Sequence, residues 1–138
     1  MSPYDIPVGY RFAGMASGIK ASGKLDLALI CSDRPAQVAG VYTSNKVIAA
    51  PLQISQPRTA AGHCQAALVN SGNANACTGD SGLQVAKLTS SLLAKELSLD
   101  ESLIAVASTG VIGVQMPLTP FEHGIPKLVE SLAADQAS

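Results

Sequence analysis

Charged residues are scarce in this chain of 138 residues. They make up 14% of the sequence, compared with about 25% in an average soluble domain. Apolar residues make up 47%. A freestanding small domain normally carries more charge on its surface, whereas a piece that packs against further chain does not need it. The low charge therefore favours a unit that is incomplete on its own.

Basic clusters and aromatic residues are also missing. Tryptophan is absent, aromatics are 4% of the chain, and the net charge is -1. The nine Lys and Arg residues are scattered singly. Nucleic-acid binding needs a basic surface for the phosphates and usually aromatic rings for the bases. We therefore expect no nucleic-acid partner.

Long hydrophobic runs do not occur. The longest apolar stretches, such as residues 103–107, are far shorter than the roughly 20 residues that cross a bilayer. The first twelve residues, MSPYDIPVGYRF, have neither a basic start nor an apolar run, so they do not predict a secretory signal. We expect no membrane partner and a cytoplasmic location.

Residues that bind metals or form disulfides are few. The cysteines are Cys31, Cys64 and Cys77, and the histidines are His63 and His123. An odd number of cysteines without a C-x-x-C pair predicts neither a disulfide framework nor a zinc site. We interpret all five as structural or surface residues and expect no metal and no bound cofactor.

The first half of the chain predicts short strands. Residues 9–17 are a candidate strand, and the composition of residues 18–24 is typical of a turn. Residues 25–31 alternate imperfectly and predict a strand that the segment 32–35, Ser-Asp-Arg-Pro, closes. Residues 38–43 then predict its neighbour in a hairpin.

The middle of the chain predicts a buried strand and an unusual turn. In residues 44–64, where Pro51 interrupts an apolar stretch, we expect a crossing segment and a short strand. Residues 66–69, AALV, predict a compact buried strand. Residues 70–79 are rich in Asn and Gly, which supply unusual backbone angles.

A helix follows this turn. Its apolar residues recur at steps of three and four, which is the period of a helix that is buried on one side. Thr78 or Asp80 is expected to cap its start through a side-chain oxygen. The apolar stripe consists of Leu83, Ala86, Leu88, Leu92, Leu93 and Leu97.

The end of the chain predicts another strand and helix. Residues 103–107 are a strand candidate, and residues 120–132 predict a helix that breaks or restarts near Gly124 and Pro126. The element order, strands first and then strand, helix, strand and helix, predicts a mixed α/β fold with helices on one face of a mixed sheet.

Two short sequence motifs within residues 17–24 are interpreted as parts of a turn that neither binds phosphate nor catalyses a reaction. Residues 18–24 nearly match a phosphate-binding P-loop, but Leu25 stands where the motif needs Ser or Thr, and a strand rather than a helix follows. Residues 17–20 match the Ser-x-x-Lys of penicillin-recognising enzymes, but two glycines and no helical stripe occur there.

Two Gly-rich segments at strand ends are more informative. Residues 70–79 present backbone N–H groups that suit an anion, but a tight strand-to-helix connection is the better interpretation for each Asn. Residues 108–113 place hydroxyl and N–H donors side by side, as an oxyanion hole requires. On composition alone a loop without chemistry is favoured, and no set of nucleophile, base and orienting group can be assembled.

Four segments together resemble one family. They are VNSGNANACTG (69–79), VASTGVIG (106–113), GIKASGKLDLALICSD (18–33) and AGVYTSNKVIAAP (39–51). They resemble the ornithine acetyltransferases, which are glutamate N-acetyltransferases of arginine biosynthesis, in the family's order. The resemblance covers the chain from about Gly9 to the last helix.

The resemblance implies a self-cleaving transferase. Members of the family are made as one precursor that cuts itself at an Ala-Thr bond, and the freed Thr becomes the nucleophile. An N-terminal Thr can use its own α-amine as base, so no histidine is required. The Thr takes acetyl from N-acetylornithine and passes it to glutamate, and some members also accept acetyl-CoA as a co-substrate.

The resemblance carries over to two residues. The Thr-Gly oxyanion hole of the family matches Thr109 and Gly110, whose hydroxyl and backbone N–H would stabilise the tetrahedral intermediate. The cleavage site and the other substrate contacts have no match and are expected beyond Ser138. We therefore expect residues 1–138 to be a single N-terminal segment of the alpha chain that is inactive alone.

The implied architecture is an α-β-β-α layered sandwich, of which this chain supplies part. The implied partner is the beta chain of the same precursor, in a heterotetramer of two alpha and two beta chains. Two alternatives remain open. One is a related self-cleaving aminopeptidase or amidase, and the other is a non-catalytic remnant that binds an amino acid or a partner chain.

Overall fold

The computed structural model describes residues 7–134. Its strands and helices alternate along most of the chain, and a single 3-10 turn precedes the last strand. In chain order they are β1 (Tyr10–Met15), β2 (Leu27–Gln37), α1 (Ala50–Ala60), β3 (His63–Asn73), α2 (Gly79–Leu97), η1 (Glu101–Leu103), β4 (Ile104–Val111) and α3 (Thr119–Glu130).

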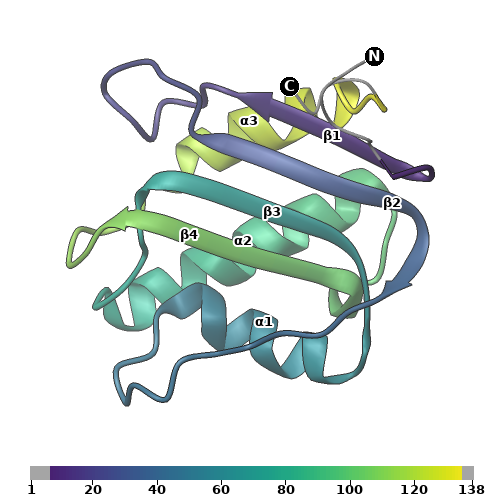
Figure 1. Cartoon of the computed structure of the whole chain (residues 1–138). Helices are drawn as coiled ribbons and strands as arrows, with labels where there is room; N and C mark the ends of the chain where they lie inside the picture. Colours follow the sequence, from purple (N-terminus) through teal and green to yellow (C-terminus); the bar gives the residue numbers. More distant parts are fainter. Residues whose placement is uncertain (1–6, 135–138) are drawn as a thin grey trace.

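The strands form one mixed sheet in the order β1-β2-β3-β4 (Figure 1). β2 is antiparallel to both β1 and β3, whereas β3 and β4 are parallel. A parallel pair needs a long crossover connection, and α2 provides it. The predicted mixed α/β fold class is confirmed, and so are strands at 9–17, 66–69 and 103–107.

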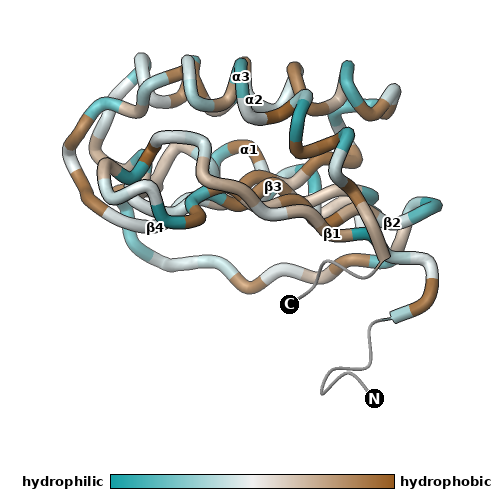
Figure 2. Tube along the Cα trace, turned by 90° about the horizontal axis from the view of Figure 1, so that it is seen from above, coloured by the Kyte–Doolittle hydropathy of each residue, from teal (hydrophilic) through white to brown (hydrophobic). Residues whose placement is uncertain are grey.

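Helices α2 and α3 form a layer along one side of the sheet (Figure 2). α1 packs mainly against β4 and α2. The core fills the space between these layers, and each fully buried large aliphatic side chain contributes about 1.5–3 kcal/mol. The side chains that are at most 2% exposed include Leu27, Leu29, Leu68, Leu93, Ile104, Ile125 and Leu128.

The opposite side of the sheet is apolar, and Tyr42, from the segment between β2 and α1, is found beside Ala67, Ala105 and Ala107. Side chains on a strand alternate between its two faces, so the residues between the buried ones point away from the helices. In residues 7–134 no helix covers this side (Figure 2). We call it the open face, and its central residues are Ala28, Ile30, Ala67, Val69, Ala105 and Ala107.

The predicted turn at residues 32–35 and the hairpin to residues 38–43 are wrong. β2 continues to Gln37, and its pairing with β3 shifts register between Cys31 and Ala36. A β-bulge of this kind accommodates a proline inside a strand. Residues 38–43 form neither helix nor strand.

The prediction for residues 44–64 is also wrong, because most of this segment is helix α1. Pro51 lies in the first turn, where its missing N–H costs nothing. The hydroxyl of Ser55 donates to the Val106 carbonyl at 2.7 Å and accepts from the Val106 N–H at 2.8 Å. Tertiary contacts with β4 therefore hold a helix that lacks an apolar stripe.

The predicted helices α2 and α3 are confirmed, with two corrections. Leu88 of the expected stripe is 43% exposed. α3 is continuous through Gly124 and Pro126, so the predicted break is wrong. Gly124 is buried where α3 packs closely on β2, since a Cβ there would lie 3.0 Å from a methyl carbon of Leu27. None of the helices in the described part of the chain is long and apolar enough to cross a membrane.

Candidate active site

The two Gly-rich segments meet at one end of the sheet. β3 and β4 are parallel, so their carboxyl ends lie at the same edge, where α/β proteins usually bind ligands. Ser71 pairs with Thr109, and Gly72 pairs with Gly110. Residues 70–73 and 108–111 are strand rather than loop, which corrects the predicted start of both loops.

Three buried asparagines tie this end together. Asn70, Asn73 and Asn75 are 3%, 6% and 2% exposed. Their side-chain amides donate to the carbonyls of Asn73 (2.9 Å), Val114 (3.1 Å) and Gly82 (2.9 Å), respectively. Each of these side-chain amides therefore donates a hydrogen bond to a backbone carbonyl of the protein itself. The interpretation of residues 70–79 as a tight strand-to-helix connection is therefore confirmed, and Asn75 itself has a positive φ of 47°.

The predicted side-chain cap of α2 is wrong. Thr78 occupies the N-cap position, but no side-chain oxygen caps the free N–H groups of α2. The hydroxyl of Thr78 donates instead to Oδ1 of Asn75 at 2.8 Å. The Asn75 side chain and the free N–H groups of the helix compete for the Thr78 hydroxyl, and the Asn75 side chain is the partner observed.

The site residues predicted from the family resemblance lie at the end of β4. Ile104 and Val106 are buried beneath the helices, so the alternation along the strand turns Ala105, Ala107 and Thr109 toward the open face. Thr109 is exposed, and its hydroxyl makes no hydrogen bond within the described part of the chain. This hydroxyl is therefore free to donate.

Gly110 holds the neighbouring backbone close to β3. Its φ is +132°, and a Cβ at this position would lie 2.4 Å from the carbonyl carbon of Gly72. Gly72 itself has a φ of +105°. Only residues without a side chain allow two backbones to approach in this way, so the position of Gly110 is fixed by contact with Gly72.

A buried carboxylate organises the neighbouring turn. Asp26 is 3% exposed and accepts the N–H groups of Ser17 (2.6 Å), Gly18 (3.2 Å) and Lys20 (2.8 Å), and also the Ser17 hydroxyl. Burial raises the pKa of Asp26, but these hydrogen bonds outweigh that effect and lower the pKa below its usual value. The interpretation of residues 17–24 as a turn is confirmed.

This turn packs against the site. A Cβ at Gly72 would lie 2.8 Å from Cγ of Lys20 and 3.2 Å from a methyl carbon of Ile19. The backbone carbonyl of Asp26 also accepts the N–H of Ser71 at 2.9 Å. Sequence reasoning missed Asp26, although a lone carboxylate in the apolar segment 25–31, next to a Gly-rich turn, was a usable signal.

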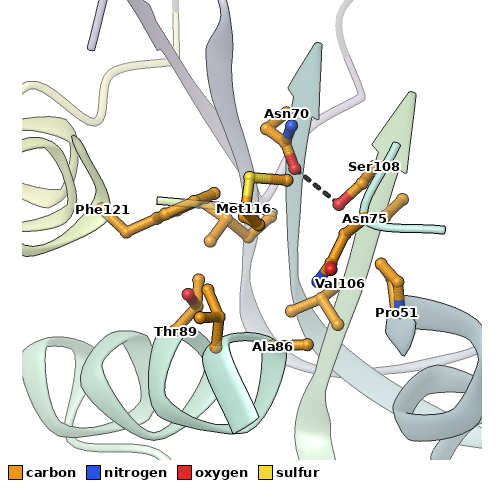
Figure 3. Close-up of a pocket in the computed structure, with 12 residues that line it drawn as sticks. Pro51, Asn70, Asn75, Ala86, Thr89, Val106, Ser108, Met116 and Phe121 are labelled. Carbon is orange, nitrogen blue, oxygen red and sulfur yellow. Dashed lines mark hydrogen bonds between the residues drawn. The ribbon is translucent and has the colours of Figure 1, made fainter. Parts of the chain in front are cut away.

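A small cavity lies beneath the strand ends, on the helix side (Figure 3). Its volume is about 20 Å³, which is room for about one water molecule. A molecule the size of an amino acid does not fit in it. Its lining includes Asn70, Thr89, Val106, Ser108, Met116 and Phe121.

The cysteines and histidines do not converge on Thr109. His63 begins β3 at the other end of the sheet, and His123 lies on α3. Cys31 is buried, which raises its thiol pKa, and Cys64 donates to the Leu103 carbonyl at 3.2 Å. Residues 7–134 contain no group of three side chains that could hold a metal ion. The third cysteine, Cys77, is exposed on the turn between β3 and α2.

The family profile and the curated relatives that match this chain all point to one family. The profile of the ArgJ family matches residues 11–138. A curated relative from Geobacter sulfurreducens, named arginine biosynthesis bifunctional protein ArgJ, is 53% identical over 126 residues, which are 91% of this chain and 32% of the relative. The protein of the same name from Syntrophotalea carbinolica is 54% identical over 125 residues, again 91% and 32%.

Solved structures agree. Ornithine acetyltransferase from Mycobacterium tuberculosis, complexed with ornithine, matches with a TM-score of 0.89 and 40% identity, over 93% of this chain and 69% of that one. ArgJ from Bacillus halodurans matches with a TM-score of 0.86 and 41% identity, over 92% and 65%. The expected fold, part of a layered α/β sandwich, is confirmed. The chain spans about a third of the curated relatives' length.

Proposed function

Because this chain belongs to the ArgJ family, we propose that it is the N-terminal part of a glutamate N-acetyltransferase. The complete enzyme would move an acetyl group from N-acetylornithine to glutamate in arginine biosynthesis. Support comes from the names of its relatives, which are arginine biosynthesis proteins, and from the solved ornithine acetyltransferase that carries ornithine.

In this proposal Thr109 and Gly110 form the oxyanion hole. The observation that carries it is the unengaged Thr109 hydroxyl on the open face, beside a Gly110 that contacts Gly72. Donors of this kind are effective because they are oriented before the charge develops, and the loss of one costs about 3–4 kcal/mol of barrier. Residues 1–138 would thus contribute charge stabilisation and no nucleophile.

The reaction proceeds through two half-reactions on a Thr outside this chain. The Thr hydroxyl attacks the amide carbon of N-acetylornithine, its proton passes to the Thr α-amine, and the carbonyl oxygen becomes an oxyanion. The Thr109 hydroxyl and the Gly110 N–H stabilise that oxyanion until the C–N bond breaks and ornithine leaves with the proton. The amine of glutamate then attacks the acetyl ester and gives a proton to the Thr α-amine, and a second oxyanion forms. As the ester C–O bond breaks, the Thr oxygen takes up that proton and N-acetylglutamate leaves.

The remaining parts of the proposal concern what lies beyond this chain. We propose that the nucleophilic Thr arises by cleavage of an Ala-Thr bond and begins a beta chain whose sheet covers the open face. Two alpha and two beta chains would form a heterotetramer in the cytoplasm, with acetyl-CoA as a second acetyl donor and no bound cofactor. The apolar residues of the open face, including Ile30 at 40% exposure, support this packing.

The test uses what we call the joined protein, which is this chain continued by the part of the Geobacter sulfurreducens relative that it does not span. Acetyl transfer from N-acetylornithine to glutamate is expected in the joined protein and not in the chain alone. Thr109→Ala should lower kcat by a hundred- to a thousandfold. Thr119→Ala, which changes an exposed Thr at the start of α3, is the control and should leave kcat unchanged.

Three outcomes would contradict the proposal. Transfer by the chain alone would place the nucleophile within it. Hydrolysis of a simple peptide in place of acetyl transfer would favour a self-cleaving aminopeptidase or amidase. A folded joined protein without activity would favour a non-catalytic module that binds an amino acid or a partner chain.

A further inference from the structure

β4 is an edge strand, and side chains of α1 hold its first half. Ser55 bonds both backbone groups of Val106, and Nη1 of Arg58 donates to the Ile104 carbonyl at 3.0 Å. These bonds satisfy strand groups that have no neighbouring strand on that side. They end at Val106, three residues before Thr109 of the candidate oxyanion hole.

A different side chain holds the second half of β4. The Ser108 hydroxyl donates to Oδ1 of Asn70 at 2.6 Å (Figure 3). In the described part of the chain this is the one side-chain hydrogen bond to residues 107–111. Asn70 is 3% exposed, and its Nδ2 donates to the Asn73 carbonyl at 2.9 Å. One buried amide therefore joins both strand ends.

The two hydrogen-bond partners of the Asn70 side chain, Ser108 and Asn73, are close in sequence to the contact between Gly110 and Gly72. Ser108 directly precedes Thr109, and Asn73 directly follows Gly72. Asn70 and Asn73 both lie on β3, so a shift of β4 along β3 would break the Ser108–Asn70 bond and change where Gly110 rests on Gly72. The amide thus opposes the motion that would displace the oxyanion donors, which must lie within about 0.5 Å of their productive position.

We propose that Asn70, acting through Ser108, is a positioning residue that fixes Thr109 and Gly110 for stabilisation of the oxyanion. This inference rests on the proposed function. Asn70 is not a catalytic residue, because Ser108 points to the helix side of the sheet and Thr109 to the open face. Its effect reaches the substrate through the backbone of β4.

The kinetic test compares variants of the joined protein. Ser108→Ala and Asn70→Ala should lower kcat about five- to tenfold, which corresponds to one lost hydrogen bond, with little change in KM. Ser108→Thr keeps the hydroxyl and should restore most of the rate. The control is Ser32→Ala, which removes a buried hydroxyl bond to the Arg34 carbonyl at the far end of β2 and should leave kcat unchanged.

A double-mutant comparison separates positioning from general stability. Because Ser108 is proposed to position both donors, Ser108→Ala should lower kcat by a clearly smaller factor in Thr109→Ala, where only the Gly110 N–H remains, than in the parent. Equal fold losses in both backgrounds would overturn the inference, because they would mean that Ser108 affects the reaction independently of Thr109.

A second measurement decides the same point without activity. Amide hydrogen exchange of the peptide 108–113 in the joined protein should become at least about fivefold faster in Ser108→Ala and Asn70→Ala. In Ser32→Ala it should not change. Unchanged exchange at 108–113 in Ser108→Ala would overturn the inference, even in a joined protein that lacks acetyl transfer. In that protein, faster exchange would support the positioning role while the proposed function fails.

Discussion

At the scale of single residues, buried polar side chains set the shape of the candidate site. Asp26 holds the turn 17–20 through backbone N–H groups, and Asn70, Asn73 and Asn75 bind backbone carbonyls. Buried polar groups are costly unless they are bonded, so these four side chains make alternative loop conformations unfavourable. The result is a rigid end of the sheet beneath Thr109.

Asp26 predicts how stability depends on pH. Its folded pKa is lowered, so its contribution is complete above the unfolded value of about 3.9 and is lost as the pH falls through the folded pKa. At pH 7, Asp26→Asn should lower the free energy of unfolding of the joined protein by about 2 kcal/mol. The difference from the parent should shrink below pH 4, as followed by urea midpoints.

The matched control is Asp33→Asn. Asp33 forms an ion pair with Arg11 at 3.3 Å, but the two side chains are 61% and 44% exposed, so its loss should cost at most about 1 kcal/mol. An Asp26→Asn effect that stays constant from pH 7 to pH 2 would show that the carboxylate charge is not responsible.

The glycine pair makes a second residue-scale prediction. Gly110→Ala adds a methyl group 2.4 Å from a backbone carbon at a φ of +132° and should cost about 3 kcal/mol or more. Gly113→Ala, at a φ of +79° with open space around it, should cost only about 1–2 kcal/mol. Thermal unfolding of the two joined-protein variants compares steric contact with backbone strain, and equal losses would contradict the close approach.

The sequence predicted part of this residue-scale order. The composition of residues 70–79 correctly indicated unusual angles, which Gly72, Asn75 and Cys77 adopt. It did not indicate the partners of the asparagines, because the accepting carbonyls of Gly82 and Val114 are brought near only by α2 and β4. The preference for unusual backbone angles depends on the residues of the segment itself, whereas the hydrogen-bond partners of its side chains depend on how distant elements pack.

At the scale of elements, local patterns found α2 and missed α1. α2 has an apolar stripe at helical spacing, which is a property of its own sequence. α1 contains Pro51 and Pro57 and lacks such a stripe, so its helix depends on bonds from Ser55 and Arg58 to β4. Tertiary contacts of this kind override propensity and cannot be seen in a single segment.

Ser55 tests the dependence of α1 on β4. Ser55→Ala leaves the Val106 N–H and carbonyl without their partner and should lower the free energy of unfolding by about 1–3 kcal/mol. Gln56→Ala, one residue further on the exposed side of α1, should change it by less than about 0.5 kcal/mol. Urea unfolding of the joined protein measures both, and similar effects would mean that α1 does not depend on this contact.

At the scale of the whole molecule, the sheet is covered on one side and open on the other. The helix side buries the core, while the open face presents small and apolar side chains with Ile30 at 40% exposure. A contiguous exposed apolar surface often marks an interaction site. The scarcity of charge in the sequence agrees with this one-sided burial, and both support the proposal that a further layer packs on the open face.

The open face predicts opposite effects of one substitution in two contexts. Ile30→Lys should make the chain alone more soluble, because a charge interrupts the apolar surface. In the joined protein it should lower the free energy of unfolding by more than about 2 kcal/mol, because the charge becomes buried. Leu88→Lys is the control, since Leu88 is 43% exposed on the outer side of α2, and it should be tolerated in both contexts.

The measurements are the soluble fraction of the chain alone and the urea midpoint of the joined protein. A joined protein that tolerates Ile30→Lys as well as Leu88→Lys would show that nothing packs on the open face.

Both borders of the sheet are engaged by the chain itself. Ser55 and Arg58 bind the outer groups of β4, and Ala133 exchanges two backbone hydrogen bonds with Phe12 on the outer side of β1. A fifth strand would have to displace these contacts before it could join. Further chain can therefore be added more easily as a second layer stacked on the face of the sheet than as an additional strand at either edge.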